Sequence, residues 1–158
     1  MRSTINKYII TFKALINMAA DAGLHTNLTP LKKFHKIKVN DEEQAARIYL
    51  TDAEIEALYQ MPLEEGSLSC HVRDVFLCGV YTGQRISDYN NLCADNFRKS
   101  ESKGYDVVSL TQKKVGNKVV VPVLNSNLLS IVEKYEYNPP RVHDVILNRE
   151  IKSILKEL

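Results

Sequence analysis

The sequence is poor in cysteine, and the few cysteines it has form no recognisable framework. Cys70, Cys78 and Cys93 are an odd number, with no CxxC spacing and no companion pair of histidines. This argues against a disulfide scaffold and against a zinc site. Cys78 lies in the apolar run from Val75 to Val80, where a thiol behaves as a small hydrophobe, so we do not expect it to be a nucleophile.

Long apolar segments are also missing. No run approaches the length of a membrane span, and the N-terminus has no apolar signal-peptide core. There is no internal repeat and no low-complexity tract. We therefore expect a soluble globular protein that stays in the cytoplasm and has no membrane partner. Its 158 residues suffice for one ordinary domain, or for a small domain and part of another.

The net charge of +2 hides an uneven distribution of charge along the chain. Residues 1–48 carry eight Lys or Arg against four Asp or Glu, and residues 98–118 carry six against two. Residues 49–97 carry only two basic residues against eight acidic ones. The two basic blocks are candidates for contact with nucleic-acid phosphates, although excesses of this size also occur on ordinary solvated faces.

Apolar periodicity and capping signals predict a mainly α-helical protein. One example is Thr51 with Glu54, which form a capping box at the start of a helix. The expected helices cover residues 3–22, 52–60, 70–81, 86–93, 126–135 and 148–158. A basic segment, residues 30–38, follows the first helix, and the polar residues 39–48 after it have the character of a linker.

A small antiparallel β-sheet completes the expected α+β fold. The β-branched runs Tyr105–Thr111 and Lys118–Val123 predict a hairpin whose turn uses Gly116-Asn117. Pro122 lacks an amide donor, so it belongs at a strand end or at a sheet edge.

The most informative segment is Tyr81-Thr82-Gly83-Gln84-Arg85-Ile86-Ser87-Asp88, in which a glycine turn presents one arginine after an apolar stretch. A guanidinium donates two parallel hydrogen bonds to a phosphate and keeps its charge at any physiological pH. Local sequence alone favours a plainer interpretation, in which Arg85 begins a helix and pairs with Asp88, three residues later, on its surface.

A second basic feature lies at the hairpin turn, where Lys113, Lys114 and Lys118 cluster. Lysines at such a position usually keep a strand edge solvated and unpaired.

Both segments resemble motifs of one family, the tyrosine recombinases or phage-type integrases. Asp74 to Leu92 resembles the family's first arginine box, an apolar helix ending in Thr-Gly-x-Arg and followed by an acid and a leucine. Gln112 to Pro122 is similar to its catalytic hairpin, in which x-Lys-Thr-Gly-x-Lys precedes an apolar strand that ends in proline. Lys114 then takes the place of the catalytic lysine, and Val115 departs from the commoner threonine. If the turn register differs by one residue, Lys113 is the catalytic lysine.

The resemblance implies roles for these residues on double-stranded DNA. Arg85 would hold the scissile phosphate, Lys114 would protonate the departing 5′ oxygen as a general acid, and Asp88 would support Arg85. The family needs no metal and no cofactor. The residues expected to contact DNA are Lys32, Lys33, Lys36, Lys38, Lys113 and Lys118.

The resemblance also implies a domain organisation. Residues 1–38 would be the C-terminal part of a helical core-binding domain, residues 39–48 a linker, and residues 49–158 the N-terminal half of the catalytic domain. The family completes its site with a His-x-x-Arg box, a further His or Trp, and a nucleophilic tyrosine. No histidine here has an arginine three residues later, and no tyrosine matches the nucleophile.

We therefore expect a DNA-binding fragment of a recombinase that integrates or excises a mobile element. Its partners would be double-stranded DNA and other recombinase protomers, and it would be unable to complete strand exchange through a phosphotyrosine. The alternative is a non-catalytic DNA-binding regulator, or a module that docks onto a recombinase. A regulator would have a basic recognition helix, whereas the helices around Arg85 carry almost no positive charge.

Overall fold

The computed structural model describes residues 2–24, 27–38, 49–100, 102 and 104–158. The chain divides into two compact units, Met1–Tyr49 and Leu50–Leu158. The expected linker, residues 39–48, lies outside the described residues. Within the described ranges, no helix is long and apolar enough to cross a membrane.

Unit 1 consists of one long helix and a returning segment. The helix α1 (Arg2–Asp21) confirms the expected helix over residues 3–22, and Gly23 follows it with a left-handed φ of 74°. A short 3-10 helix, η1 (Thr29–Lys33), leads into an extended stretch that lies along α1. The side-chain amide of Asn6 fixes this stretch, because its Oδ1 accepts from the N–H of Ile37 at 2.7 Å and its Nδ2 donates to the carbonyl of Ile37 at 2.8 Å.

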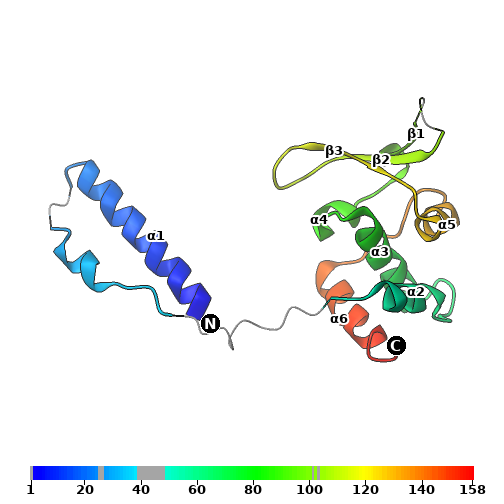
Figure 1. Cartoon of the computed structure of the whole chain (residues 1–158), viewed down its shortest axis with the longest axis horizontal. Coiled ribbons are helices and arrows are strands. Elements are labelled where there is room, and N and C mark those ends of the chain that lie inside the picture. The colour runs from blue at the N-terminus through cyan, green and yellow to red at the C-terminus, as the bar shows by residue number, and fades with distance from the viewer. Residues whose placement is uncertain (1, 25–26, 39–48, 101, 103) are drawn as a thin grey trace. The chain divides into compact units, whose positions relative to one another are not determined.

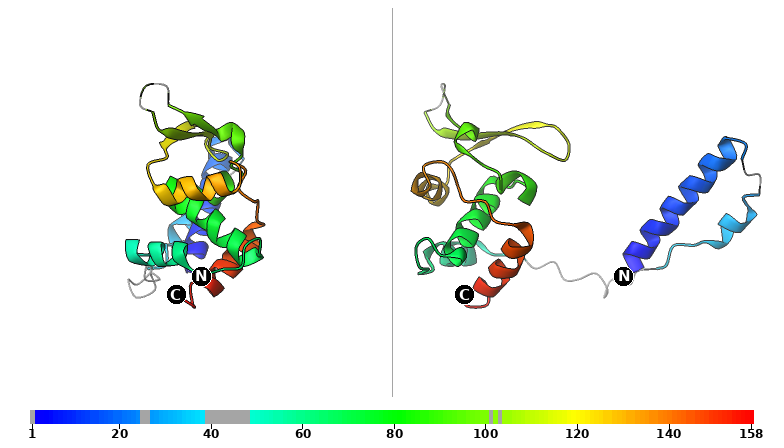
Figure 2. Two further views of the ribbon diagram at one scale, coloured as in Figure 1. Left: turned by 90° about the vertical axis from the view of Figure 1, so that its right-hand side faces the viewer. Right: turned by 180° about the vertical axis from the view of Figure 1, so that it is seen from behind.

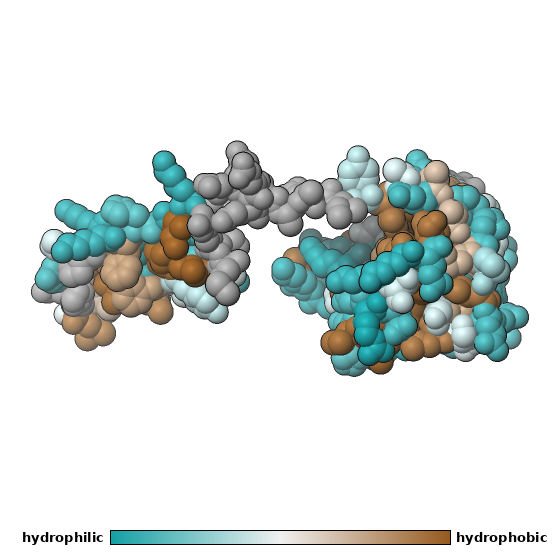
Figure 3. Space-filling model, turned by 90° about the horizontal axis from the view of Figure 1, so that it is seen from below, coloured by the Kyte–Doolittle hydropathy of each residue, from teal (hydrophilic) through white to brown (hydrophobic). Residues whose placement is uncertain are grey.

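Unit 1 leaves most of its apolar surface exposed. Along α1, Ile5, Tyr8, Phe12 and Leu15 recur every three or four residues and so share one helix face. Tyr8 is 70% exposed and Leu15 is 58% exposed. The ring of Phe12 contacts that of Phe34, with 5.6 Å between the ring centroids. Apolar surface of this kind is visible on unit 1, at the left of Figure 3. No side chain described in unit 1 is fully buried.

Unit 2 begins with two helices that local signals predict correctly. In α2 (Asp52–Gln60) both bonds of the capping box form, since Thr51 Oγ1 accepts from the N–H of Glu54 and the Glu54 carboxylate accepts from the N–H of Thr51. The next helix, α3 (Leu68–Thr82), is capped by Ser67 and ends at Gly83, whose φ is 65°.

The following helix, α4 (Ile86–Tyr89), is shorter than the expected helix over residues 86–93. Asn90 leaves the helix because its side chain pairs with the backbone of Val142, where Oδ1 accepts from the N–H at 3.0 Å and Nδ2 donates to the carbonyl. The same Nδ2 lies 3.2 Å from Oδ1 of Asp144. Asn90 is only 5% exposed, so these bonds satisfy a buried amide.

The sheet has three antiparallel strands in the order β1-β2-β3. The expected hairpin is confirmed as β2 (Asp106–Thr111) and β3 (Lys118–Pro122), with Thr111 opposite Lys118. A further strand, β1 (Phe97–Lys99), follows the 3-10 helix η3 (Ala94–Asn96) and was not expected. Pro122 ends β3, which is an edge strand, as its missing N–H predicts.

Two helices close the chain. Of the two residues that the sequence offers as a cap for α5 (Ser126–Lys134), Asn125 and Ser126, it is Asn125 that accepts from the N–H groups of Asn127 and Leu128. The last helix, α6 (Asp144–Ile154), begins four residues before the expected start at Asn148, because His143 caps it.

The end of α5 is a Schellman motif with a strained residue. The N–H of Tyr137 donates to the carbonyl of Val132 at 2.7 Å, and the N–H of Glu136 donates to that of Glu133 at 2.9 Å. Glu136 has a φ of 49° and Tyr137 a φ of 62°. A left-handed residue at this position is usually glycine.

The helices and the sheet of unit 2 share one core. Figure 1 shows the sheet at one end of the unit, with α4, α3 and α5 next to it and α2 and α6 farther away, and Figure 2 shows the same order from two other sides. Helix α3 is central and packs on α2, α4, α5 and α6. The core consists of Leu58, Val72, Val75, Leu77, Cys78, Leu92, Val108, Leu110, Val123, Leu128, Ile131, Val132, Val142, Leu147, Ile151 and Ile154.

Candidate functional site

The turn between α3 and α4 exposes Arg85. The left-handed Gly83 ends α3, and its N–H donates to the carbonyl of Gly79 at 2.9 Å. Arg85 then takes the extended backbone of an N-cap residue, with φ −75° and ψ 155°. Its side chain is exposed and forms no hydrogen bond or ion pair with the described residues. The guanidinium is therefore free to meet an anion.

The surface ion pair that local sequence favours for Arg85 and Asp88 does not form. Asp88 is 5% exposed, and its Oδ1 accepts a hydrogen bond from the backbone N–H of Lys113 at 2.9 Å. The carboxylate thus holds the hairpin tip, residues 112–117 between β2 and β3. Among the described residues, it forms no hydrogen bond or ion pair with the Arg85 guanidinium. Its second oxygen, Oδ2, is buried without a hydrogen-bond partner in that part of the chain.

Backbone hydrogen bonds within the tip close the connection between β2 and β3. The N–H of Gln112 donates to the carbonyl of Asn117 at 2.9 Å, and the N–H of Gly116 donates to that of Gln112 at 2.8 Å. Gly116 has a φ of 72°, which favours glycine. Around this closed tip, Lys113, Lys114 and Lys118 are all exposed.

A second contact joins the tip to the turn between α3 and α4, residues 83–85, which we call the arginine turn. Nε2 of Gln112 donates to Oε1 of Gln84 at 2.9 Å. Gln84 directly precedes Arg85, and Gln112 and Lys113 directly precede Lys114. The structure therefore brings together two segments that are 28 residues apart, and in Figures 1 and 2 the β2–β3 tip lies beside α4.

The remaining candidate lysines belong to unit 1. Lys32 and Lys33 end η1, while Lys36 and Lys38 lie in the extended stretch after it. All four are exposed, and none forms an ion pair with a described residue. They make a short basic segment on the surface of that unit.

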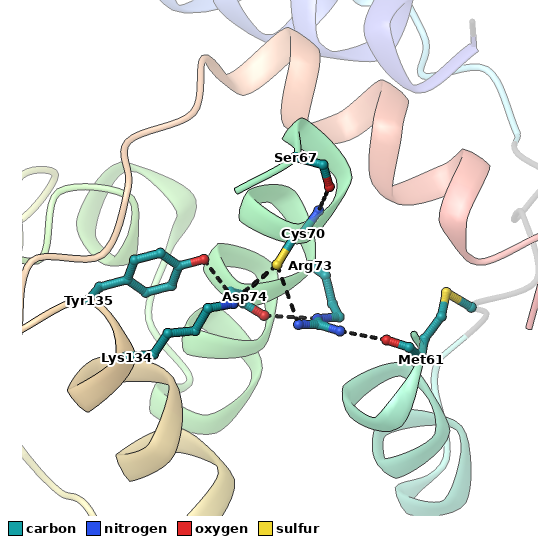
Figure 4. Close-up of polar contacts among 7 residues, drawn as sticks. All are labelled: Met61, Ser67, Cys70, Arg73, Asp74, Lys134 and Tyr135. Carbon is teal, nitrogen blue, oxygen red and sulfur yellow. Dashed lines mark hydrogen bonds and ion pairs between the residues drawn. The ribbon is translucent and has the colours of Figure 1, made fainter. Parts of the chain in front are cut away.

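Sequence reasoning missed the densest polar cluster of unit 2, which surrounds Asp74 (Figure 4). Asp74 is 1% exposed and accepts from four donors, one of which is the thiol of Cys70, 3.8 Å from Oδ2. Nε of Arg73 lies 2.8 Å from Oδ1, while Nζ of Lys134 and the hydroxyl of Tyr135 lie 2.9 and 2.8 Å from Oδ2. Nζ of Lys134 is also 3.1 Å from Sγ of Cys70.

Burial and these contacts shift the pKa values of Asp74, Tyr135 and Lys134. Burial alone would raise the pKa of Asp74, but the hydrogen bonds from Lys134, Arg73 and Tyr135 outweigh it and lower that pKa below its ordinary value. Burial and then the Asp74 carboxylate raise the pKa of Tyr135. Burial would lower the pKa of Lys134, but hydrogen bonds to Asp74 and Cys70 raise it. Burial raises the pKa of the nearby Cys78 thiol to about 12, and Asp74 adds to this.

The Asp74 cluster joins three elements. Arg73 and Asp74 come from α3, Lys134 ends α5, and Nη1 of Arg73 donates to the carbonyl of Met61, at the end of α2, at 2.7 Å (Figure 4). Every oxygen of the carboxylate is engaged by these neighbours, so we assign the cluster to packing of the helices rather than to chemistry. An acid inside an apolar helix is the sequence signal that could have revealed it.

One concave surface lies at the β1 end of the sheet. It has a volume of about 310 Å³ and is lined by residues that include Phe97, Lys99 and Tyr137, none of which is among the expected site residues. The described residues contain no group of three or more His, Cys, Asp or Glu side chains arranged to hold a metal ion.

Comparison with known proteins adds no relative from which a role for these residues could be inferred. No protein-family model, no curated protein and no solved structure matches the chain. The functional assignment therefore depends on the residues and on the contacts between the arginine turn and the hairpin.

Proposed function

We propose that this chain is a DNA-binding fragment of a tyrosine recombinase, carrying the arginine and lysine half of the active site. The observation that carries the proposal is the junction of the two motifs, through Asp88 with Lys113 and through Gln84 with Gln112. These two contacts join the segments that carry the exposed cations Arg85 and Lys114.

Each cation has a task that suits its chemistry. The free guanidinium of Arg85 donates two parallel hydrogen bonds to the non-bridging oxygens of a phosphodiester and offsets the charge that develops when the diester is cleaved. Lys114 carries a proton on a single ammonium that can approach the departing 5′ oxygen and transfer the proton to it. Asp88 holds the backbone at Lys113, one residue before Lys114.

Unit 1 would add contacts with the DNA backbone. The exposed lysines of residues 32–38 add phosphate contacts, and the uncovered apolar face of α1 suits a helix that belongs to a larger helical domain. The 158 residues contain no His-x-x-Arg sequence. We therefore expect the chain by itself to form no phosphotyrosine. The proposal also includes binding to double-stranded DNA, in the cytoplasm and without a cofactor.

Duplex binding at several salt concentrations tests the proposal. We expect weak binding with little sequence preference, because phosphate neutralisation dominates, and a steep loss of affinity as salt rises. Arg85→Gln should reduce the slope of log K against log salt by about one. Arg85→Lys keeps the charge but loses the paired hydrogen bonds, so it should restore the slope and only part of the affinity.

A matched control is Lys152→Gln, which removes an exposed positive charge on α6, outside the two basic blocks. If Lys152→Gln weakens binding as much as Arg85→Gln does, Arg85 is not a phosphate clamp. Tight binding to one sequence, insensitive to salt, would favour the DNA-binding regulator instead. On a denaturing gel after incubation with nicked duplex, protein-linked DNA would show that a nucleophile is present after all.

A further inference from the structure

We propose that Gln84 and Gln112 are a positioning pair that docks the tip of the β2–β3 hairpin against the arginine turn before any DNA binds. The lysines of the tip then have a fixed place that depends neither on DNA nor on a second protomer. The meaning of this for catalysis rests on the proposed function, but the docking itself is a property of the free chain.

The orientation of Gln84 is set from its own side of the contact. Its Nε2 donates to the carbonyl of Thr82 at 3.2 Å, and a carbonyl can only accept. The amide oxygen must therefore point away from Thr82, toward the hairpin. Thr82 is itself held at the end of α3, because its hydroxyl donates to the carbonyl of Cys78 at 2.6 Å. Gln84 thus presents a fixed acceptor one residue before Arg85.

The hairpin supplies the matching donor. Nε2 of Gln112 reaches Oε1 of Gln84 at 2.9 Å, and the next backbone N–H, at Lys113, reaches Asp88. Two adjacent residues of the tip are therefore bonded to two anchors, Gln84 next to Arg85 and Asp88 in α4, and both glutamines are partly buried. A single contact would leave the tip free to pivot, whereas two contacts on neighbouring residues restrict its rotation.

The two glutamines also provide a matched pair of variants. Gln84→Glu and Gln112→Glu add the same charge at nearly the same place and keep the side-chain length. Gln84→Glu loses the bond to the Thr82 carbonyl but still offers an acceptor to Gln112, so the contact between the tip and the turn survives. Gln112→Glu removes the donor and sets a carboxylate against the oxygen of Gln84, so the contact breaks.

The experiment is amide hydrogen exchange of the DNA-free chain, read by NMR at the N–H of Lys113. We expect protection in the unmodified chain, little change in Gln84→Glu, and exchange about two- to tenfold faster in Gln112→Glu, the factor expected for one lost hydrogen bond. The core amide of Val75, in α3, reports global stability and should not change. If Gln112→Glu lowers that stability, Gln112→Met, uncharged and of similar length, takes its place.

The docking is refuted if Lys113 exchanges at the rate of an unfolded peptide in the unmodified chain. It is also refuted if both glutamate variants behave alike, because charge alone would then explain them. Duplex affinity of the same variants separates this inference from the proposed function. Protection of Lys113 with equal affinities for the two variants supports docking and counts against a role for the tip lysines on DNA.

Discussion

The backbone N–H of Lys113 donates a 2.9 Å hydrogen bond to Oδ1 of Asp88, 25 residues earlier in the chain. Asp88 is 5% exposed, so the bond ties the hairpin to a buried point next to the arginine turn. Its other oxygen has no partner among the described residues, and an unpaired buried carboxylate oxygen carries a desolvation penalty. Asp88 therefore stabilises the hairpin through one hydrogen bond. Its buried oxygen without a hydrogen-bond partner opposes folding of unit 2.

Substitution of Asp88 separates these two effects. Asp88→Ala leaves the N–H of Lys113 without its acceptor, and we expect a loss of about 1–3 kcal/mol in the free energy of unfolding. Asp88→Asn keeps an acceptor and removes the charge, so it should cost much less. Urea denaturation measures both. An asparagine variant that loses as much as the alanine variant would show that the charge itself is needed.

Close packing between α3 and α4 should make Gly79 sensitive to substitution. A Cβ at Gly79 would lie 2.5 Å from Cε1 of Tyr89, so Gly79→Ala forces the ring to move. We expect a loss of about 1–3 kcal/mol, typical of overpacking in a core. The double variant Gly79→Ala with Tyr89→Leu should recover part of it, since the ring is the obstacle. Equal losses in the single and double variants, by thermal unfolding, would point to a different cause.

The Asp74 cluster predicts a pH-dependent contribution to stability. The pKa of Asp74 is lower in the folded chain than its ordinary value of about 4, so its contribution is complete above that value and is lost as pH falls. At neutral pH Asp74→Asn should cost about 3 kcal/mol, because it leaves Lys134 and Arg73 without their partner. The deficit should shrink as pH falls below about 4. Asp95→Asn, at an exposed residue, controls for the lost charge.

The strained end of α5 predicts a stabilising change. Glu136→Gly relieves a left-handed φ of 49° and should add about 1 kcal/mol to the free energy of unfolding. Glu133→Gly, the same substitution inside α5, should have the opposite sign, with a loss of about 1 kcal/mol from helix propensity. Urea denaturation compares them. If both variants are destabilised, the Glu136 side chain makes a contribution larger than the strain.

The sequence predicted those helices and strands whose formation depends on residues close to one another in the chain. The capping box at Thr51 and Glu54 places the start of α2, and the β-branched runs place the β2–β3 hairpin. The three residues of β1 were missed because Phe97–Lys99 is short and two of its residues are charged. That strand forms by pairing with β2, and no local property of the three residues indicates it.

The candidate site shows the same division between local and distant causes. Arg85 and the lysines of the hairpin could be singled out from charge and from turn chemistry. The contact of Gln84 with Gln112 could not, because neutral amides 28 residues apart give no sequence signal. The Asp74 cluster was missed for a related reason, since its partners Lys134 and Tyr135 lie some 60 residues later.

The pairing of Asn90 with Val142 has a consequence for the order of events during synthesis. Asn90 ends the short helix behind Arg85, yet its partner follows 52 residues later. While the chain is being made, residues up to Asn90 emerge long before Val142, so the amide has no intramolecular partner at first. The bond that ends α4 can therefore form only after Val142 has emerged and the long loop between the two residues has closed. We expect the rate at which unit 2 matures to depend on this closure.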